Sequence, residues 1–378
     1  MVRVLLHAKI HTGNRTIPDG FIRFNKQIIS VGPFNKYVRL PKDQIKDVSG
    51  ITVVPGFIDI HTHGGYGADS MNPDPEVISH FVDQMAQEGV TSVFLTTMTQ
   101  SALAISKSMA NIKKAAEINP KIQGIHLEGP FISPAHNGAQ PIKLIQPMDV
   151  KKLATWYKLS GGLIKLVTYA PEEKWDPRLE DYCDVHHIRL AVGHSDATYQ
   201  LLQNLQIQHV THLYNAQRGF HHREVGVVGY AMLSDTAKVE LICDGFHVAP
   251  EAVKIAYKTI GPNRLELITD SMEAKGMPDG IYQLGGQVVE VHGGKATMAN
   301  GHLAGSVLKF SDAFKNMIKF TKCSVASAVK MSSTNQANEF HLTHKGFLEE
   351  GYDADINLFD NHLDLMATYS YGKLVKKD

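Results

Sequence analysis

The sequence predicts an α/β protein made of a TIM-like (β/α)8 barrel and a small β-sandwich domain that both ends of the chain form together. Apolar, strand-like runs alternate with segments of helical periodicity about eight times through the middle of the chain. Both ends read instead as short strands broken by turns. The 378 residues are enough for two such units. We expect the small domain to comprise residues 1–53 plus 347–378, and the barrel residues 54–346.

The amino-terminal segment has no helical pattern of useful length, and Asp19-Gly20 supplies turn chemistry within it. The strands expected there are 2–8, 21–24, 27–31 and 51–54. A β unit of this size cannot enclose a core by itself. At the other end, residues 355–359 and 363–375 are again strand-like, with a turn at Tyr371-Gly372. We therefore expect the two ends of the chain to pair with each other.

The middle of the chain implies parallel strands joined by crossover helices, and eight such strands imply a closed barrel. A doubly wound open sheet is the alternative, but no G-x-G-x-x-G motif follows the first strand. Two Gly-Gly pairs predict an inserted hairpin within 280–298. The predicted strands are 54–61, 92–97, 122–128, 164–169, 188–194, 209–213, 238–243 and 265–270. The predicted helices are 75–89, 102–118, 148–159, 199–205 and 250–260.

Charge and cysteine content narrow the classes of function. Lys plus Arg and Asp plus Glu both number 38, so no global charge favours nucleic acid, an anionic membrane surface or a polyanion. Three widely spaced cysteines argue against a disulfide framework. The apolar part of the amino terminus is too short for a signal peptide, and no run reaches membrane-spanning length. We expect a cytoplasmic protein without nucleic-acid or membrane partners.

Potential metal ligands stand at the ends of five predicted strands. His61 and His63 end the first, and because residues i and i+2 of a strand point to the same side, both rings can face one ion. An isolated His-x-His is as compatible with a structural role, but the carboxyl ends of barrel strands meet at one rim. Imidazole and carboxylate donors without thiolate suit zinc, iron or manganese. The strand-end donors are His61, His63, Glu128, His194, His212 and Asp270.

Several longer motifs surround these residues. They are Pro55-Gly-Phe-Ile-Asp-Ile-His-Thr-His-Gly64, His126-Leu-Glu-Gly-Pro-Phe131, Gly193-His-Ser195, Thr211-His-Leu-Tyr-Asn-Ala216, Asp244-Gly-Phe-His247, Ile268-Thr-Asp270 and Leu303-Ala-Gly-Ser306. The first is common to many amidohydrolases, whereas the second, fourth and fifth are more particular. With these motifs the chain resembles the N-acetylglucosamine-6-phosphate deacetylases of the amidohydrolase superfamily, and the similarity runs over essentially its whole length.

The resemblance implies a metal-dependent hydrolase that removes acetate from N-acetylglucosamine 6-phosphate. One divalent ion would be bound by Glu128, His194 and His212. Asp270 would act as acid and base. His61 and His63 make a second ion possible, with Glu128 as a bridge and Asp270 completing the second set. This chemistry is reasonable, because amide hydrolysis needs water whose pKa a metal lowers toward ~7 and a carboxylate that returns the proton to the departing amine.

The resemblance also assigns the substrate contacts. Arg223 and His247 would hold the sugar phosphate, and because in relatives the arginine reaches across a subunit interface, we expect a homodimer. Asp244 would orient His247 or the sugar. Some relatives carry His at the position of Gln140, and an amide there can form hydrogen bonds but cannot act as an acid. The substrate-binding residues implied are Ala139, Gln140, Asn215, Ala216, Arg223, Asp244, His247, Leu303, Ala304 and Gly305.

Other interpretations are possible. Another amidohydrolase, of the D-aminoacylase, dihydroorotase or adenine deaminase type, would be indicated by a carboxylated lysine on the fourth strand, where Lys165 stands. The motif around His247, together with Arg223, opposes that reading. A non-catalytic barrel scaffold is disfavoured because the ligand set is complete. The basic residues that depart from the usual pattern after Ala216 are interpreted as solvated loop residues; they are Arg218, His221 and His222.

Overall fold

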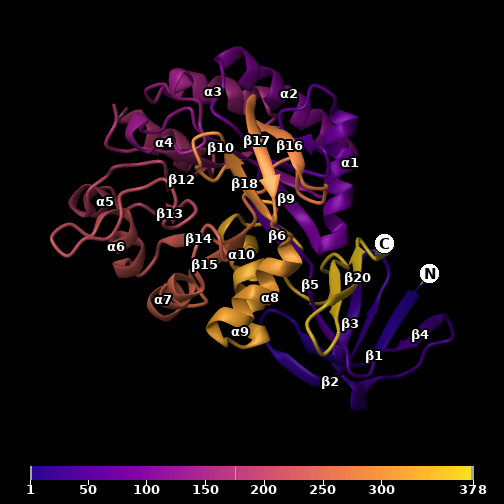
Figure 1. The fold of residues 1–378 in the computed structure, drawn as a ribbon. Coiled ribbons are helices and arrows are strands. Elements are labelled where there is room, and N and C mark those ends of the chain that lie inside the picture. Colours follow the sequence, from indigo (N-terminus) through magenta and orange to yellow (C-terminus); the bar gives the residue numbers. More distant parts are fainter. Residues whose placement is uncertain (1, 175, 376–378) are drawn as a thin grey trace.

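The computed structural model describes residues 2–174 and 176–375 (Figure 1). Met1, Trp175 and residues 376–378 lie outside the described residues, and so do the outermost ends of the predicted small domain. A large body of strands and helices is joined to a smaller all-β body that receives strands from both ends of the chain (Figure 1).

Eight parallel strands form the larger body, and this confirms the predicted (β/α)8 barrel. Neighbouring strands are hydrogen-bonded in the order in which they follow one another in the sequence. Their side chains are nearly all buried, which is why the segments read as continuous apolar runs. The strands are β6 (Phe57–Thr62), β9 (Val90–Thr97), β10 (Ile122–Glu128), β11 (Ile164–Tyr169), β12 (Arg189–Val192), β13 (His209–Val210), β14 (Lys238–Ile242) and β15 (Leu265–Ile268).

The barrel closes at a seam between β15 and β6, its last and first strands. The backbone N–H of Asp270 donates to the carbonyl of His61 at 2.8 Å. The N–H of His63 donates in turn to the carbonyl of Ser271 at 2.8 Å. Closure of the barrel therefore places Asp270 beside the two histidines of β6.

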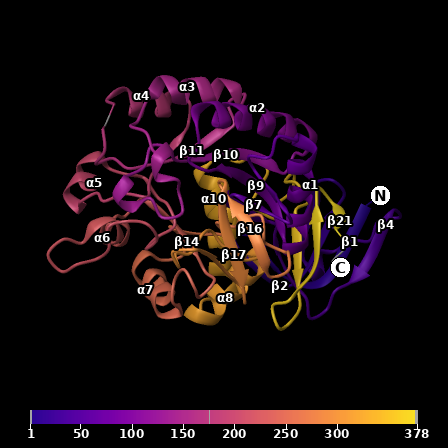
Figure 2. The ribbon, with the colours of Figure 1, turned by 45° about the horizontal axis from the view of Figure 1, so that its top comes forward.

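Helices surround the strands (Figure 2). The side chains of Asp74, Ser101 and Asp149 accept backbone N–H groups at the starts of α1, α2 and α3. The α-helices are α1 (Pro75–Met85), α2 (Ala102–Ile118), α3 (Val150–Leu159), α4 (Arg178–Val185), α5 (Tyr199–Leu205), α6 (Gly226–Leu233), α7 (Pro250–Ile260), α8 (Phe310–Thr321), α9 (Val325–Val329) and α10 (Asn335–Glu339). Shorter turns are η1 (Phe34–Lys36), η2 (Ala86–Glu88), η3 (Pro134–His136), η4 (Ile142–Leu144) and the π-turn η5 (Lys330–Thr334). None of the helices in the described part of the chain is long and apolar enough to cross a membrane.

The smaller body is one hydrogen-bonded sheet that folds over its own core. Its order is β21-β20-β19-β5-β1-β2-β3, with β4 beside β1. Phe24 of β2 and Tyr369 of β20 are distant in that order, yet their ring centroids lie 5.0 Å apart. The sheet is therefore bent into two packed layers. Its strands are β1 (Val2–His11), β2 (Thr16–Phe24), β3 (Ile28–Pro33), β4 (Asp43–Asp47), β5 (Thr52–Pro55), β19 (Ile356–Phe359), β20 (Leu365–Ser370) and β21 (Lys373–Val375).

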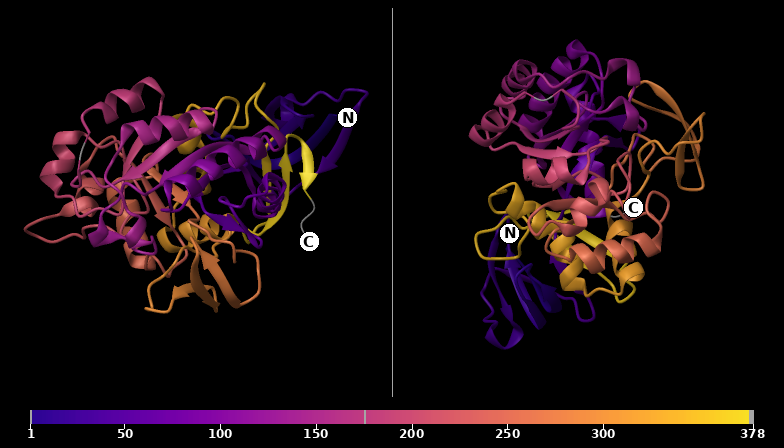
Figure 3. Two further views of the ribbon diagram at one scale, coloured as in Figure 1. Left: turned by 90° about the horizontal axis from the view of Figure 1, so that it is seen from above. Right: turned by 90° about the vertical axis from the view of Figure 1, so that its left-hand side faces the viewer.

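Two small antiparallel sheets interrupt the barrel pattern. β7 (Gly64–Gly65) and β8 (Ala68–Asp69) pair directly after β6. The predicted hairpin within 280–298 is a three-stranded sheet, because a second Gly-Gly turn leads into a third strand. Its strands are β16 (Gly280–Leu284), β17 (Gln287–His292) and β18 (Lys295–Met298). This inserted sheet projects from the barrel (Figure 3).

Candidate metal centre and active site

Six side chains from five strand ends converge at the carboxyl-terminal rim of the barrel. They are His61, His63, Glu128, His194, His212 and Asp270. Glu128, the last residue of β10, is central. Its Oε1 lies 3.2 Å from His194 Nε2 and 3.0 Å from His212 Nε2, and its Oε2 lies 3.1 Å from His63 Nε2. Asp270 Oδ1 is 3.3 Å from His63 Nε2 and 3.4 Å from His61 Nε2. The structure thus brings together all six donors predicted from the sequence.

The donors form two groups, and within each group the ligand atoms lie within 4.8 Å of one another. The first is Glu128, His194 and His212, and the second is His61, His63 and Asp270. Among the described residues, buried His61 Nε2 forms no hydrogen bond of good geometry, although Glu128 Oε1 and Asp270 Oδ1 each lie 3.4 Å from it, and such an atom is rare in a protein interior. A cation held by the second group would satisfy it. Nitrogen and oxygen donors without sulfur fit zinc, iron or manganese.

Three of these donors have backbone φ angles that non-glycine residues rarely adopt. His194, His212 and Asp270 have φ of 49°, 27° and 47°. Each is the second residue after the end of a barrel strand, so the chain turns sharply at the rim and directs the side chain inward. Strained conformations of this kind are maintained where the surrounding structure fixes them, and they cluster at functional sites.

Two of the histidines are oriented by a second hydrogen bond. His194 Nδ1 lies 2.9 Å from the carbonyl oxygen of His136, and His61 Nδ1 lies 2.9 Å from Glu240 Oε2. When each Nδ1 carries the proton, Nε2 is free to bind a metal. Glu240 was missed in the sequence because it lies within β14 and belongs to no motif. A carboxylate between Val239 and Leu241 in an apolar strand was the only signal.

Gln140 fixes the carboxylate of Glu128. Its Nε2 donates to Glu128 Oε2 at 2.7 Å, and its Oε1 accepts the backbone N–H of Thr99 at 2.7 Å. Because both ends of the amide are used, its orientation is determined. Gln140 therefore holds a metal-site carboxylate in place without adding another titrating group to the cavity.

Opposing charges govern protonation at the site. Burial lowers the pKa of His63, but Asp270 and Glu128 outweigh this effect and raise it to about 9. Burial lowers the pKa of His61 as well, and the carboxylates of Glu240, Asp270 and Glu128 hold it well above its ordinary value. Burial raises the pKa of Glu128, but the surrounding histidines hold it well below its usual range. A cation bound here must therefore displace protons from imidazole.

A cavity of about 390 Å³ lies above the donors. Most of the predicted substrate-binding residues line it; they are Ala139, Gln140, Asn215, Ala216, His247, Leu303 and Gly305. His63, Glu128, His194, His212 and Asp270 form its floor, while His61 is buried beneath. Met98, His136, Leu284 and His302 also line it and were not predicted. His136 follows the motif ending at Phe131 by a few residues and Met98 follows a predicted strand, but nothing in their local sequence distinguishes them from packing residues.

Three predicted substrate-binding residues do not line the cavity. Asp244 instead contacts His247, with Oδ2 2.6 Å from Nδ1, and so orients that ring. Ala304 is buried, and its N–H donates to the carbonyl of Ala296 in β18. Arg223 is exposed on the loop before α6, where its Nη1 lies 2.9 Å from His222 Nε2.

The other basic residues of that loop have local partners. Arg218 Nη2 donates to Asp196 Oδ2 at 2.7 Å, and His136 Nε2 lies 2.9 Å from Asp196 Oδ1. The exposed rings of His221 and His222 have centroids 4.2 Å apart. Arg218 thus anchors the loop to the rim, whereas the two histidines contact each other.

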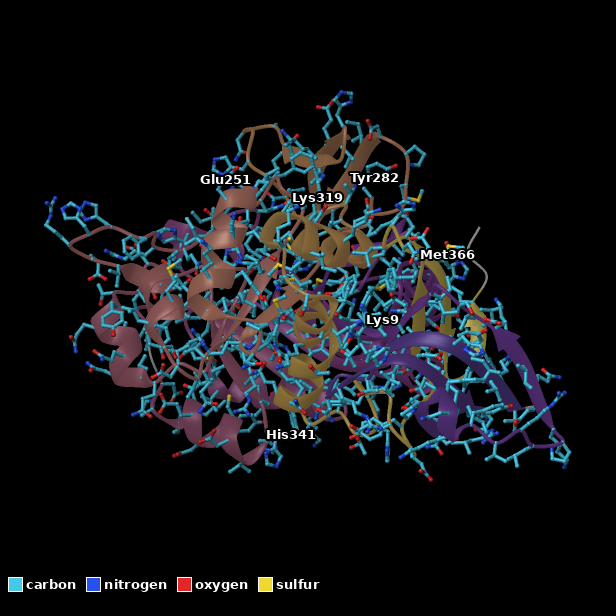
Figure 4. The ribbon with its side chains drawn as sticks, turned by 90° about the horizontal axis from the view of Figure 1, so that it is seen from below. Lys9, Glu251, Tyr282, Lys319, His341 and Met366 are labelled. Atoms are coloured by element: carbon cyan, nitrogen blue, oxygen red, sulfur yellow. The ribbon has the colours of Figure 1, made fainter. Side chains whose placement is uncertain are left out.

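Lys165 lies away from the rim. It lines a separate cavity with Arg189 and His341. His341 and Tyr282, a residue of the inserted sheet, lie at opposite edges of the molecule (Figure 4). On the same strand as Lys165, Thr168 reaches the rim, and its Oγ1 lies 2.7 Å from His126 Nε2. A carboxylated Lys165 therefore cannot bridge two ions at this site.

Comparisons with known proteins all identify amidohydrolases, and mainly amino-sugar phosphate deacetylases, as similar to this chain. The model of the amidohydrolase family matches residues 52–375. The chain is 39% identical over 382 residues to the N-acetylglucosamine-6-phosphate deacetylase of Bacillus subtilis (strain 168), covering 97% of this chain and 95% of that protein. It is 33% identical over 327 residues to the N-acetylgalactosamine-6-phosphate deacetylase of Escherichia coli O157:H7, covering 85% and 86%. A variant of the Mycobacterium smegmatis N-acetyl-D-glucosamine-6-phosphate deacetylase, solved in complex with N-acetyl-D-glucosamine-6-phosphate, has a TM-score of 0.92 at 27% identity, covering 99% and 98%.

Proposed function

The chain belongs to the amidohydrolase family, and from that premise we propose that it removes the acetyl group from N-acetyl-D-glucosamine 6-phosphate, giving D-glucosamine 6-phosphate and acetate. The observation that carries this proposal is the position of Asp270. Its carboxylate lies on the floor of a sugar-sized cavity, beside His63 of its own donor group. Near-full-length relatives with this activity in their names support the substrate.

The residues at the rim have different roles in amide hydrolysis: one transfers protons, and others align the metal-site donors. Asp270 takes a proton from the attacking water and gives it to the amide nitrogen as the C–N bond breaks, so that the amine leaves neutral. Gln140 keeps Glu128 aligned, and the backbone carbonyl of His136 keeps the His194 ring aligned. A divalent ion held by these donors would supply an acidified water and polarise the acetyl carbonyl.

We propose that this chain holds two divalent ions of zinc, iron or manganese. Glu128 directs Oε1 toward His194 and His212, and Oε2 toward His63, as a bridging carboxylate would. The second group has the complete set His61, His63 and Asp270. The proposal for two ions thus rests on both donor groups being intact and on the unpartnered Nε2 of His61.

The sugar phosphate is proposed to lie over Asn215, Ala216 and His247, with His247 held by Asp244. Arg223 does not line the cavity of its own chain and is exposed on the loop before α6. That loop projects from the body of the molecule (Figure 2). We propose a homodimer in which Arg223 binds the phosphate in the neighbouring subunit, since a guanidinium fork matches phosphate oxygens.

The experiment is to measure acetate release from N-acetylglucosamine 6-phosphate by the wild type and by Asp270→Asn. The variant should lose 10²–10⁴-fold in kcat, roughly the contribution of a positioned acid and base. Asp364→Asn, at an exposed carboxylate paired with Lys315, is the matched control and should be unaffected. Undiminished acetate release by Asp270→Asn, with metal content measured in parallel, would remove the assigned role.

The substrate specificity of the wild-type protein is tested in the same acetate-release assay. The Escherichia coli relative is named for the galactosamine epimer, so both N-acetylhexosamine 6-phosphates and unphosphorylated N-acetylglucosamine are assayed together. We expect the phosphorylated glucosamine compound to be hydrolysed fastest. A preference for an N-acyl amino acid would instead favour the D-aminoacylase type, which the position of Lys165 opposes.

A further inference from the structure

A second cavity, of about 370 Å³, adjoins the substrate cavity. His63, Met98 and Leu284 line both cavities and therefore form the divider between them. The far wall comes from the segment after β8, from the start of α2 and from the Gly285-Gly286 turn of the inserted sheet. No residue with an assigned role lines the second cavity, except His63 at the divider.

Of the three residues in the divider, the apolar Met98 and Leu284 can be replaced without removing a metal-site donor, unlike His63. Met98 follows β9 directly, is 4% exposed, and its backbone N–H donates to the sulfur of Met71 at 3.4 Å. A Cβ built on Gly285 would lie 3.1 Å from Met98 Cε, so the end of the methionine lies against the turn of the inserted sheet. Leu284, also 4% exposed, belongs to the same apolar cluster.

The order of strands in the barrel indicates which part of the substrate faces this divider. Residues proposed to hold the sugar, Asn215 and His247, follow β13 and β14, which are the sixth and seventh strands. Met98 follows β9, the second strand, and so lies across the barrel from them. With the scissile amide over the donors at the centre, the acyl substituent must extend toward Met98.

We propose that Met98, with Leu284, limits the length of the N-acyl group, and that the second cavity is an acyl chamber which longer chains enter once Met98 is shortened. This inference deepens the proposed deacetylase function and rests on it. The reaction is the same for any acyl chain: one water is consumed, the C–N bond breaks, and a carboxylate and a free amine are formed.

The test compares kcat/KM for N-acetyl-, N-propionyl- and N-butyrylglucosamine 6-phosphate in the wild type and in Met98→Ala. The wild type should discriminate against each added methylene by about 10-fold or more, as apolar pockets do. Met98→Ala should raise the butyryl-to-acetyl ratio at least ~10-fold. Met366→Ala is the matched control, because Met366 is 54% exposed in β20 of the small domain (Figure 4). Its ratio should equal that of the wild type.

A second variant distinguishes use of the chamber from general loosening of the site. Ala104 lines the second cavity and not the first. Adding Ala104→Phe to Met98→Ala should fill the chamber, return the butyryl-to-acetyl ratio toward the wild-type value and leave N-acetyl hydrolysis as in Met98→Ala. An unchanged ratio in a folded Met98→Ala protein with wild-type metal content overturns the inference. Absence of N-acetyl hydrolysis in the wild type would instead overturn the proposed function.

Discussion

Glu240 contacts two of the metal-site residues from beneath. Its Oε2 lies 2.9 Å from His61 Nδ1 and accepts the backbone N–H of His212 at 3.0 Å. Its Oε1 lies 3.3 Å from His209 Nε2, and His209 Nδ1 lies 3.0 Å from Glu339 Oε1. One buried carboxylate thus couples a ligand of each donor group to a hydrogen-bonded chain that continues through the barrel interior.

Replacing Glu240 should weaken metal binding before it affects the fold. Glu240→Ala should lower affinity for the second ion about 10–100-fold, the usual effect of losing a partner of a metal-ligating histidine. Glu240→Gln keeps an oxygen acceptor for His61 and should retain more metal. Metal per chain and metal affinity are measured on apo protein titrated with zinc. Glu251→Gln, at an exposed position of α7 (Figure 4), is the control. Equal zinc affinity in Glu240→Ala and the wild type would contradict this role.

The position of a site residue could be predicted from the sequence where the fold class alone determines which side of the barrel it occupies. The six donors stand at strand ends, and a parallel barrel brings all its strand ends to one rim. Glu240, His136 and Met98 could not be predicted, because their roles depend on which side chains face them across the barrel. The cross-subunit role proposed for Arg223 comes from the resemblance to relatives and not from its local sequence, and Arg223 is exposed in its own subunit.

Elements were predictable where burial leaves a periodic pattern. The boundaries of α2, α5 and α7 agree with the predicted helices. α6 is buried on nearly all sides, so it has no polar face to set a helical period. β4 has mostly exposed side chains and no apolar alternation, although it pairs with β1 along its whole length. A side-chain contact that no sequence pattern shows also holds β4 in place.

That contact is a bidentate ion pair between Arg23 of β2 and Asp43 of β4. The Nε and Nη2 atoms of Arg23 donate to the Oδ1 and Oδ2 atoms of Asp43 at 3.0 and 2.7 Å, and the side chains are 10% and 1% exposed. The hydrogen bonds from Arg23 lower the pKa of Asp43 to about 2, from an ordinary value of 3.8. A lowered folded-state pKa stabilises the protein above pH ~4, and that contribution is lost as the pH falls toward 2.

Asp43→Asn should therefore reduce the free energy of unfolding by about 1–2 kcal/mol at pH 7. Because the asparagine does not titrate, the difference from the wild type should shrink as the pH falls from 4 toward 2. Urea unfolding followed by circular dichroism at pH 7 and pH 3 measures both quantities. The exposed pair Lys315–Asp364 provides the control, since Asp364→Asn should change stability little at either pH. A difference that is independent of pH would contradict the ionic origin.

At the scale of the whole molecule, each active site of the proposed dimer contains residues from both chains, because Arg223 comes from the neighbouring subunit. Such a site predicts complementation between inactive variants. Asp270→Asn chains retain Arg223, and Arg223→Ala chains retain Asp270, so a mixed dimer contains one complete site of its two. Random pairing of equal amounts should restore about a quarter of the wild-type activity.

The control mixes Asp270→Asn with His194→Asn, two changes that each disable the site of their own chain. That mixture should stay inactive. Acetate release is measured after the two variants are co-expressed or unfolded and refolded together, with the dimer confirmed by light scattering. No recovery in the Arg223 mixture would mean that Arg223 does not act across the interface.

The seam between β6 and β15 determines when, during folding, the second donor group is assembled. His61 and His63 are near the beginning of the barrel sequence and Asp270 near its end, and they come together where backbone hydrogen bonds close the seam. A chain interrupted before its last barrel strand lacks one donor of this group and the backbone contacts that align the other two. If a second ion binds as proposed, its site exists only after the barrel has closed, and the ion would then link the first and last strands of the barrel.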